Sequence, residues 1–559
     1  MSQSLKDADL TAELQAMAED EKTIEDCFYK ELEFGTGGLR GVIGAGTNRM
    51  NIYTVAKATQ GYADYLNEYF ASPSVAIAYD SRIKSERFAE VVAEVLAANG
   101  IQVYIYLELM PTPALSFAVR NLSCSGGIVI TASHNPAKYN GYKVYGADGC
   151  QITTKAAKEI LAKINAVDIF SGVKSMKFAK GIEQKRISYI GEETVEAFIR
   201  AVSAQSLCGD AACDKSVSIV YTPLNGTGLK CVLRCLKENG FTNISVVKEQ
   251  AEPNGHFPTC PYPNPEIREA LELGLKEAKR LGSELLLATD PDCDRVGIAV
   301  KSGDDFVLLS GNEVGMLLLD YICKRRLALK RMPKNPLVVK TIVTIDMAKR
   351  IAADYGVQVI DVLTGFKFIG EQIGFLEKKG QEDRYILGFE ESYGYLTGSY
   401  VRDKDAVNAS LMICEMFAYY KAKGQSLLDV LNGLYTKYGY CLNTLHSYEF
   451  EGASGFRKMQ DIMEKLRDNC PKTWMRRKII SVSDYQMSIT RYNDGRVEKI
   501  DLPVSNVLKF ELEDNLSVVV RPSGTEPKLK MYMSVSAGSR EEAGDLERHF
   551  VKELEAMFA

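Results

Sequence analysis

A serine hydroxyl beside a histidine is the first group in this sequence that could perform covalent chemistry. Residues 126–136 read GGIVITASHNP, a run of small and apolar residues followed by a polar turn that ends at proline. The run is typical of a buried strand, and the turn would present Ser133 and His134 at its end. Such a pair is more often structural, because serine and asparagine in turns bond their own backbone. Its interpretation therefore depends on the other polar groups of the chain.

Three aspartates stand at alternate positions between two apolar runs. The segment 285–300 reads LLLATDPDCDRVGIAV, with Asp290, Asp292 and Asp294 in its centre. Alternate residues of an extended segment point to one side, so the three carboxylates would repel one another without a cation. Oxygen ligands suit a hard ion such as Mg²⁺. An EF-hand is excluded, because Arg295 stands where that loop needs glycine and Lys301 where it needs glutamate.

Two further loops carry groups that suit a phosphorylated sugar. Glu390 and Ser392 follow a strand-like run, and carboxylates and hydroxyls complement sugar hydroxyls, which both donate and accept. Near the C-terminus an arginine, two hydroxyls and a glycine amide form a candidate anion cradle, with a plain Pro-Ser-Gly turn as the alternative. The members of this cradle are Arg521, Ser523, Gly524 and Thr525.

A glycine-rich segment, residues 34–49, contains Arg40. Glycines let backbone amides approach an anion closely, and an arginine adds a fork of donors. The spacing of the glycines matches neither G-x-G-x-x-G nor a Walker loop, so the segment does not indicate nucleotide binding.

The elements that must position these loops alternate between strand and helix. Residues 75–107 read as strand, helix and strand, which predicts a parallel α/β sheet, and fresh units begin near residues 217 and 311. The predicted units are 1–205, 206–310, 311–441 and 442–559. Residues 10–32 have apolar positions at helical spacing and predict one amphipathic helix.

Length and composition limit the class of protein. A chain of 559 residues is too long for one hydrophobic core, and its 46% hydrophobic and 25% charged residues are ordinary for a globular protein. The net charge of −5 offers no electrostatic footprint for nucleic acid. We find no signal peptide and no run long enough to span a membrane, and the 13 cysteines show no C-x-x-C spacing. We expect a cytoplasmic protein with reduced thiols that binds neither nucleic acid nor membranes.

The loop TASHNP around Ser133 resembles the active-serine loop of the alpha-D-phosphohexomutase superfamily, the phosphoglucomutases and phosphomannomutases. The resemblance extends from about Leu32 to about Tyr532, and it is greatest to long bacterial-type phosphoglucomutases and their phosphopentomutase relatives. It implies an α/β fold of three related domains with mixed sheets, plus a smaller α+β C-terminal domain, around a central cleft. It also implies that Ser133 carries a phosphoryl group, lends it to the substrate and takes it back.

The resemblance further implies a role for each candidate residue. Arg40 would reach the reacting phosphate, Lys143 would transfer a proton with His134 as the alternative, and Mg²⁺ would bind Ser133 and the three aspartates. The loop from Arg521 to Thr525 would hold the phosphate that does not react. The residues expected to contact the substrate are Arg295, Thr364, Gly365, Lys367, Glu390, Ser392 and Lys404.

The reaction implied is interconversion of α-D-glucose 1-phosphate and glucose 6-phosphate through glucose 1,6-bisphosphate, which also acts as activator. Mannose or pentose phosphates as substrates, or synthesis of glucose 1,6-bisphosphate from an acyl-phosphate donor, are open alternatives. Some mannose/glucose relatives carry a histidine after the sugar motif, and Tyr393-Gly394 in its place favours the glucose branch. The expected partners are small-molecule sugar phosphates, and the chain is expected to be a monomer or a weak homodimer.

Overall fold

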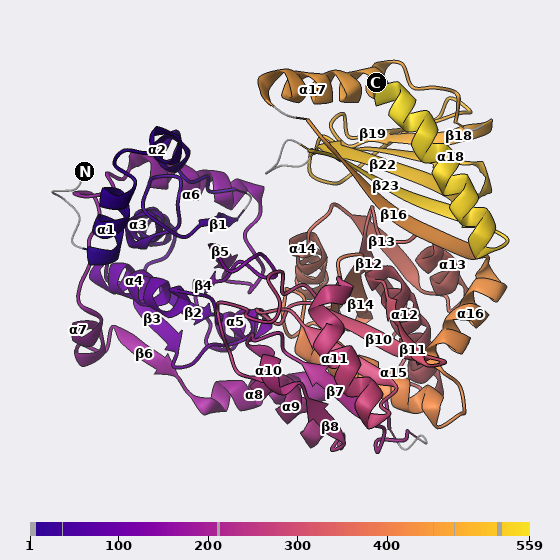
Figure 1. The fold of residues 1–559 in the computed structure, drawn as a ribbon, viewed down its shortest axis with the longest axis horizontal. Coiled ribbons are helices and arrows are strands. Elements are labelled where there is room, and N and C mark those ends of the chain that lie inside the picture. Colours follow the sequence, from indigo (N-terminus) through magenta and orange to yellow (C-terminus); the bar gives the residue numbers. More distant parts are fainter. Residues whose placement is uncertain are drawn as a thin grey trace.

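Four β-sheets follow one another along the chain (Figure 1). The structure, a computed structural model, describes residues 7–35, 37–209, 213–450, 452–474, 476–522 and 528–558. Helices alternate with strands through the first three sheets, as the sequence pattern predicts, whereas strands dominate the fourth. The expected mixed α/β architecture with a separate C-terminal unit is confirmed.

In its described residues, the first unit contains six strands and eight helices. The strands are β1 (Gly38–Val42), β2 (Ser74–Tyr79), β3 (Gln102–Tyr106), β4 (Gly126–Ile130), β5 (Tyr139–Gly146) and β6 (Ile187–Ile190). The helices are α1 (Ala8–Ala16), α2 (Glu21–Phe28), α3 (Ile52–Tyr69), α4 (Ser85–Ala98), α5 (Thr112–Asn121), α6 (Thr154–Ala166), α7 (Phe178–Glu183) and α8 (Glu192–Ser203). The strand order is β1-β5-β4-β2-β3-β6, in which β4, β2, β3 and β6 run parallel and β5 runs antiparallel to β4 and β1.

The second unit repeats this pattern with a shorter sheet. Its strands are β7 (Ile219–Thr222), β8 (Ile244–Val246), β9 (Leu285–Thr289), β10 (Val296–Ser302) and β11 (Asp305–Leu309), and its helices are α9 (Gly228–Glu238), α10 (Lys248–Ala251) and α11 (Arg268–Leu281). The order is β11-β10-β9-β7-β8. Strands β9, β7 and β8 are parallel, and β10 runs antiparallel to β9 and β11.

The third unit has the same arrangement again. Its strands are β12 (Leu337–Thr341), β13 (Gln358–Val362), β14 (Tyr385–Glu390) and β15 (Gly394–Leu396). Its helices are α12 (Gly311–Ala328), α13 (Met347–Asp354), α14 (Phe366–Glu377), α15 (Ala406–Lys421) and α16 (Leu427–Tyr438). Strands β13, β12 and β14 are parallel, and β15 closes the edge antiparallel to β14. Three sheets of one design confirm that the three α/β units are related.

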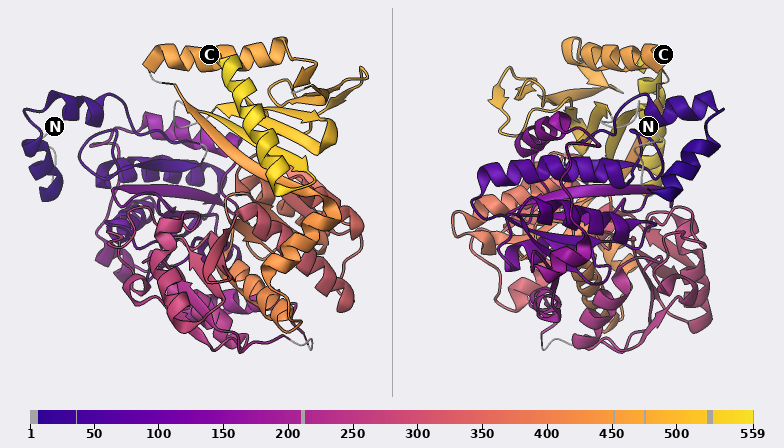
Figure 2. Two further views of the ribbon diagram at one scale, coloured as in Figure 1. Left: turned by 45° about the vertical axis from the view of Figure 1, so that its right-hand side comes forward. Right: turned by 90° about the vertical axis from the view of Figure 1, so that its left-hand side faces the viewer.

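The fourth unit is an antiparallel sheet with helices on one face. Its strands are β16 (Tyr440–Glu449), β17 (Thr473–Trp474), β18 (Arg477–Asp484), β19 (Ile489–Tyr492), β20 (Val497–Lys499), β21 (Leu508–Leu512), β22 (Leu516–Pro522) and β23 (Lys528–Ala537). Helices α17 (Gly452–Asp468) and α18 (Arg540–Phe558) share one hydrophobic core with this sheet. Figure 2 shows α18 lying across the strands. The other face of the sheet turns Lys509 and Ser517 toward Asp346 of the third unit.

Two expectations need correction. Residues 10–32 form two helices instead of one, because the Asp20 side chain accepts a hydrogen bond from the Thr23 backbone and starts a second helix there. The thiols are not all reduced, since Cys208 and Cys213 form a disulfide with Cα atoms 6.4 Å apart. The prediction considered only C-x-x-C spacing, in which the cysteines are three residues apart, so it missed Cys208 and Cys213, which are five residues apart. Within the described ranges, no helix is both long enough and apolar enough to cross a membrane.

Candidate active site

The candidate loops of the first three units occupy equivalent places in their sheets. Each loop joins a parallel strand to its antiparallel neighbour: β4 to β5, β9 to β10, and β14 to β15. Each also contains one non-glycine residue with left-handed backbone, namely Ser133 (φ 51°), Cys293 (φ 52°) and Tyr393 (φ 65°). Such residues cost conformational energy and mark tight turns held by their surroundings. The three chemically distinct loops are therefore three versions of one turn.

The Ser133 hydroxyl lies against the aspartate loop of the second unit. Its Oγ donates a hydrogen bond to Asp290 Oδ2 at 2.7 Å and lies 3.3 Å from His134 Nδ1. The Thr131 hydroxyl holds the turn by accepting from the Ser133 backbone N–H at 2.8 Å. The residue is 3% exposed, so the hydroxyl points into the interior of the site. The predicted juxtaposition of serine, histidine and carboxylate is present.

A buried arginine that we gave no role in the sequence clamps this loop. Arg82, at 3% exposure, lies just beyond β2. Its guanidinium donates to four backbone carbonyls of the loop, those of Ser133, Asn135, Pro136 and Tyr139. Arg82 also pairs with buried Asp80 and packs on the Phe257 ring of the second unit at 5.1 Å. The sequence did contain an indication of this role: Asp80 and Arg82 are oppositely charged residues directly after a buried strand, where charged residues are rare unless they are paired.

Substitution of Arg82 by methionine is expected to lower the free energy of unfolding by about 3–5 kcal/mol, because Asp80 would lose its buried counterion. Release of the four carbonyls should also displace Ser133 and reduce kcat by roughly 100-fold. Urea unfolding and turnover per folded molecule are the two measurements. Arg87→Met on the exposed side of α4 is the matched control. Unchanged turnover of the folded Arg82→Met molecules would show that the clamp does not position the serine.

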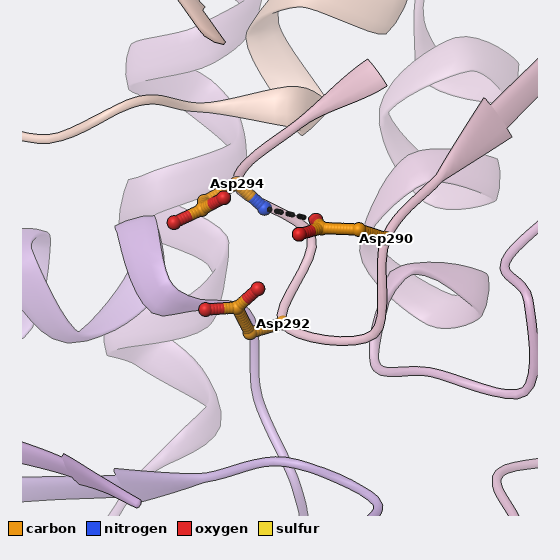
Figure 3. A group of neighbouring side chains, drawn as sticks. All are labelled: Asp290, Asp292 and Asp294. Atoms are coloured by element: carbon orange, nitrogen blue, oxygen red, sulfur yellow. Dashed lines mark hydrogen bonds between the residues drawn. The ribbon is translucent and has the colours of Figure 1, made fainter. Parts of the chain in front are cut away.

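The three aspartates converge at the β9–β10 turn (Figure 3). One carboxylate oxygen of each lies within 4.8 Å of the others, and all three residues are buried. Asp290 Oδ1 accepts from the backbone N–H groups of Asp294 (3.1 Å) and Arg295 (3.0 Å). Thr112, at the start of α5, donates to Asp292 Oδ2 at 3.0 Å. Thr112 was not predicted, although Pro111 and Pro113 beside it mark the start of a helix.

Two lysines partly neutralise this acidic cluster. Lys143 Nζ lies 2.9 Å from Asp292 Oδ2 and 3.4 Å from Asp294 Oδ2, and Lys404 Nζ lies 3.1 Å from Asp294 Oδ2. Burial opposes the charge of Lys143, but Asp292 and Asp294 outweigh it and raise the lysine pKa. Burial also opposes the charge of Asp292, yet Lys143 and Lys404 hold its pKa far below the usual value. For Asp290, burial and the charges of Asp292 and Asp294 outweigh the opposing effect of Arg295, so its pKa is raised.

The cluster still has room for a cation. Asp292 Oδ1 and Asp294 Oδ1 are buried and have no hydrogen-bond partner within the described residues. A buried carboxylate oxygen without a partner is costly unless a ligand satisfies it. Oxygen donors from three carboxylates, with the Ser133 hydroxyl beside them, are the set that suits a hard divalent ion. The residues therefore fit a metal of this type.

His134 and Arg295 flank the serine and the aspartates. Burial, together with the nearby Arg295 and Arg40, lowers the pKa of His134 to about 2, so the imidazole is neutral. Arg295 is held by Glu266 at 2.9 Å, and Glu266 was also missed in the sequence. Arg40 lies on β1 and donates to Asn135 Oδ1 at 3.2 Å. Strand β1 approaches β5 closely, since a Cβ on Gly38 would lie 1.9 Å from the Tyr142 carbonyl oxygen.

The two adjacent glutamates at the β14–β15 turn, Glu390 and Glu391, have different partners. Glu391 accepts from the hydroxyls of Thr341 and Thr344, each at 3.0 Å, and is thereby tied to its own unit. Glu390 instead lies beside Lys404, and burial raises its pKa to about 7 although Lys404 lowers it. Ser392 lies in the same turn and is half-buried. The structure thus brings Glu390 and Lys404 to the aspartate cluster.

Arg521 meets the third unit at the loop before α14. Its Nη1 donates to the Thr364 hydroxyl at 2.6 Å, and its guanidinium lies 5.9 Å from the Tyr532 ring. Gly365 has φ 112° and caps α14, and Lys367 follows in its first turn with a pKa that burial lowers. Ser523, Gly524 and Thr525 lie outside the described residues. The predicted sugar and phosphate loops are therefore joined at Arg521 and Thr364.

Comparison with known proteins gives the class of this chain. Models described as phosphoglucomutase/phosphomannomutase alpha/beta/alpha domains I, II and III match residues 31–169, 196–303 and 310–438 in order. These domains define an enzyme of the isomerase class that moves phosphoryl groups. The chain belongs to the phosphoglucomutase/phosphomannomutase family.

Relatives and solved structures agree with this assignment. A phosphoglucomutase of Staphylococcus haemolyticus is 36% identical over 520 residues, which is 93% of each chain. Parafusin, a Paramecium phosphoglucomutase solved in an open form, has a TM-score of 0.68 at 18% identity over 95% of each chain. N-acetylphosphoglucosamine mutase of Aspergillus fumigatus, solved with GlcNAc-6P and magnesium, has a TM-score of 0.53 at 14% identity over 99% of this chain and 100% of its own. The two structures show the shared fold.

Proposed function

We propose that this enzyme is a phosphoglucomutase that interconverts α-D-glucose 1-phosphate and glucose 6-phosphate through a phosphorylated Ser133. The observation that carries the proposal is the Ser133 hydroxyl, buried in an acidic cluster and bonded to Asp290 at 2.7 Å. The family membership and the phosphoglucomutase relative over 93% of the chain support it. We place the four units at 1–205, 206–310, 311–441 and 442–559, with one loop of the site on each.

The reaction consists of two phosphoryl transfers in opposite directions. In the first, the bond between phosphorus and Ser133 Oγ breaks while a free sugar hydroxyl bonds to phosphorus, and the proton of that hydroxyl passes to the released Ser133 Oγ. The product is glucose 1,6-bisphosphate, which must turn around in the site. In the second, Ser133 Oγ takes the other phosphoryl group and the sugar oxygen regains a proton. Trace glucose 1,6-bisphosphate acts as activator because it phosphorylates Ser133 at the start.

Proton transfer is assigned to Lys143, with Asp292 and Asp294 as neighbours. The neutral His134 is a poor proton acceptor, since burial and two arginines lower its pKa to about 2. Lys143 is cationic and in contact with Asp292 at 2.9 Å, so it can donate a proton when a transfer partner is in place. Arg40 and Arg295 provide positive charge toward the transferred group.

We assign the metal site to Mg²⁺. Asp290, Asp292 and Asp294 would hold it, with an oxygen of phosphorylated Ser133 as a further ligand. When bound, Mg²⁺ would neutralise negative charge that develops on the phosphoryl group.

The remaining loops orient the sugar phosphate. Glu390 and Ser392 would bind the sugar hydroxyls, while Lys404 fixes Glu390 beside Asp294. Thr364, Gly365 and Lys367 would contact the substrate from the third unit. Arg521, with Ser523, Gly524 and Thr525, would hold the phosphate that does not react, since arginine pairs with phosphate through two parallel hydrogen bonds.

Mass spectrometry of the intact protein and its peptides, after incubation with glucose 1,6-bisphosphate, tests the proposal. We expect one added phosphoryl group, located on Ser133. Turnover on glucose, mannose and ribose 1-phosphates then ranks the substrates. Formation of glucose 1,6-bisphosphate only with an acyl-phosphate donor, and no isomerisation without it, would show a synthase instead.

Arg521→Ala is expected to raise KM for glucose 1-phosphate by about 10- to 150-fold, because a charge-assisted hydrogen bond contributes about 1.5–3 kcal/mol. Transfer from phosphorylated Ser133 to a sugar without a second phosphate should change much less. Steady-state kinetics and single-turnover transfer measure the two quantities. Arg548→Ala on the exposed face of α18 is the control. Equal losses with both acceptors would place Arg521 at the reacting phosphate.

A further inference from the structure

A groove of about 960 Å³ lies in the fourth unit, away from the active-site loops. It is formed by the carboxyl end of α17 with the segment after it, and by the hairpin of β18 and β19. None of the candidate active-site residues lines it. The groove also lies beyond residue 438, where the third family domain ends. Its residues therefore have no assigned role.

Three cations in the lining of this groove lack partners. Lys472, Lys478 and Arg491 make no side-chain hydrogen bond or ion pair to any residue that the structure describes. Arg477, the residue before Lys478, is by contrast paired with Asp514 and does not line the groove. Among the described residues of the lining, Asp468 carries the single carboxylate. A concave surface with three unpaired cations and one acid attracts an anion.

The cations lie on either side of an apolar patch. Lys478 lies on β18 and pairs with Thr473 on β17. Arg491 lies on β19 and pairs with Val482 on β18. Lys478 and Val482 are four residue steps apart on β18, a distance of about 13 Å along a strand. Ile480 between them is 40% exposed and Met487 at the hairpin turn is 57% exposed. A ligand that fits this pattern combines negative charge with an apolar or aromatic group.

We propose that this groove binds a phosphorylated small molecule that carries an aromatic group, the chemical class of a nucleotide. Its volume lies in the range of small-molecule sites. Phosphate oxygens accept charge-assisted hydrogen bonds from lysine and arginine, and the ring covers Ile480 and Met487. Asp468 and the carboxyl end of α17 repel anions, so the phosphates lie toward Lys478 and Arg491. The net charge of −5 disfavours nucleic acid as the occupant.

The only tryptophan of the chain provides a reporter for this groove. Trp474 follows Lys472 and Thr473 and pairs across to Arg477 on β18. Its ring is 2% exposed and lies 4.6 Å from the Phe510 ring. Because no tryptophan lies near the active site, a change in tryptophan fluorescence reports on the groove.

The experiment is a fluorescence titration of the full chain with ADP, in the presence of Mg²⁺ and saturating glucose 1,6-bisphosphate to occupy the active site. We expect a saturable change, weakened about 10-fold or more by Lys478→Glu and by Arg491→Glu. Lys499→Glu, at an exposed lysine of the same unit paired with Asp501, is the control and should leave the affinity unchanged. Adenosine and inorganic phosphate should each bind more weakly than ADP.

The proposal is overturned if ADP gives no saturable signal, or if both groove variants bind ADP with the affinity of the wild type. It is overturned as well if inorganic phosphate binds as tightly as ADP, or if an acidic peptide binds where ADP does not. Full displacement of ADP by glucose 1,6-bisphosphate would place the nucleotide in the active site and also overturn it. Both substituted side chains are exposed to solvent, so the variants should fold. None of these results bears on Ser133, whose phosphorylation is measured separately.

Discussion

Ser133→Ala is expected to reduce glucose phosphate isomerisation by about 10⁴-fold or more, because the variant lacks the oxygen that carries the phosphoryl group. Incubation with glucose 1,6-bisphosphate should leave its mass unchanged, whereas the wild-type mass should increase by one phosphoryl group. The loss should come from chemistry alone. The removed hydroxyl bonds to Asp290 at 2.7 Å and to His134 Nδ1 at 3.3 Å, so the free energy of unfolding should fall by no more than about 3 kcal/mol.

Ser123→Ala is the matched control for this variant. Ser123 also has left-handed backbone, with φ 52° against 51° for Ser133, but it is exposed at the end of α5. The two substitutions place the same strain on the backbone, so only the position of the hydroxyl differs. Isomerase activity of Ser133→Ala close to that of Ser123→Ala would disprove the phosphoserine mechanism at Ser133. Phosphorylation of a different residue in the wild-type protein would show that this residue, and not Ser133, carries the phosphoryl group.

Asp292→Asn is expected to weaken Mg²⁺ binding by at least about 100-fold and to reduce turnover by a similar factor. Loss of an indirect, outer-shell partner alone costs 10- to 100-fold in metal affinity, and Asp292 offers a buried oxygen with no other partner in the described structure. Calorimetric metal titration measures binding without reference to turnover. Asp305→Asn, at an exposed aspartate of the same unit, is the control.

The same substitution should also destabilise the metal-free protein. Asp292 is held charged by Lys143 and Lys404, and Lys143 would keep only the longer contact to Asp294 at 3.4 Å. We expect a loss of about 1–3 kcal/mol, measured by urea unfolding in EDTA. Greater stability of Asp292→Asn under these conditions would mean that repulsion among the aspartates outweighs the lysine pairs. Normal Mg²⁺ affinity would place the metal elsewhere.

Local patterns in the sequence were sufficient to predict several strands and helices, including the strands that lead into the candidate loops. The apolar run before Ser133 becomes β4, and the runs around the aspartates become β9 and β10. Side-chain chemistry and short-range backbone preferences depend on neighbours in the chain, so they can be inferred from the residues themselves. The break at Asp20 was missed because apolar spacing continues through the cap that starts α2.

Tertiary structure alone decided which groups meet. Ser133 and Asp290 are 157 residues apart yet share a hydrogen bond, and the four carbonyls of the Ser133 loop turn toward Arg82 because the loop is folded around it. The sequence suggested that three aspartates need a cation, but it could not show that Lys143 and Lys404 already supply part of that charge. Packing of separate units sets the distances between charged side chains, and charge interactions depend on those distances. The residue types of this protein therefore determined which groups each loop carries, and only the packing of its units decided which of those groups lie side by side.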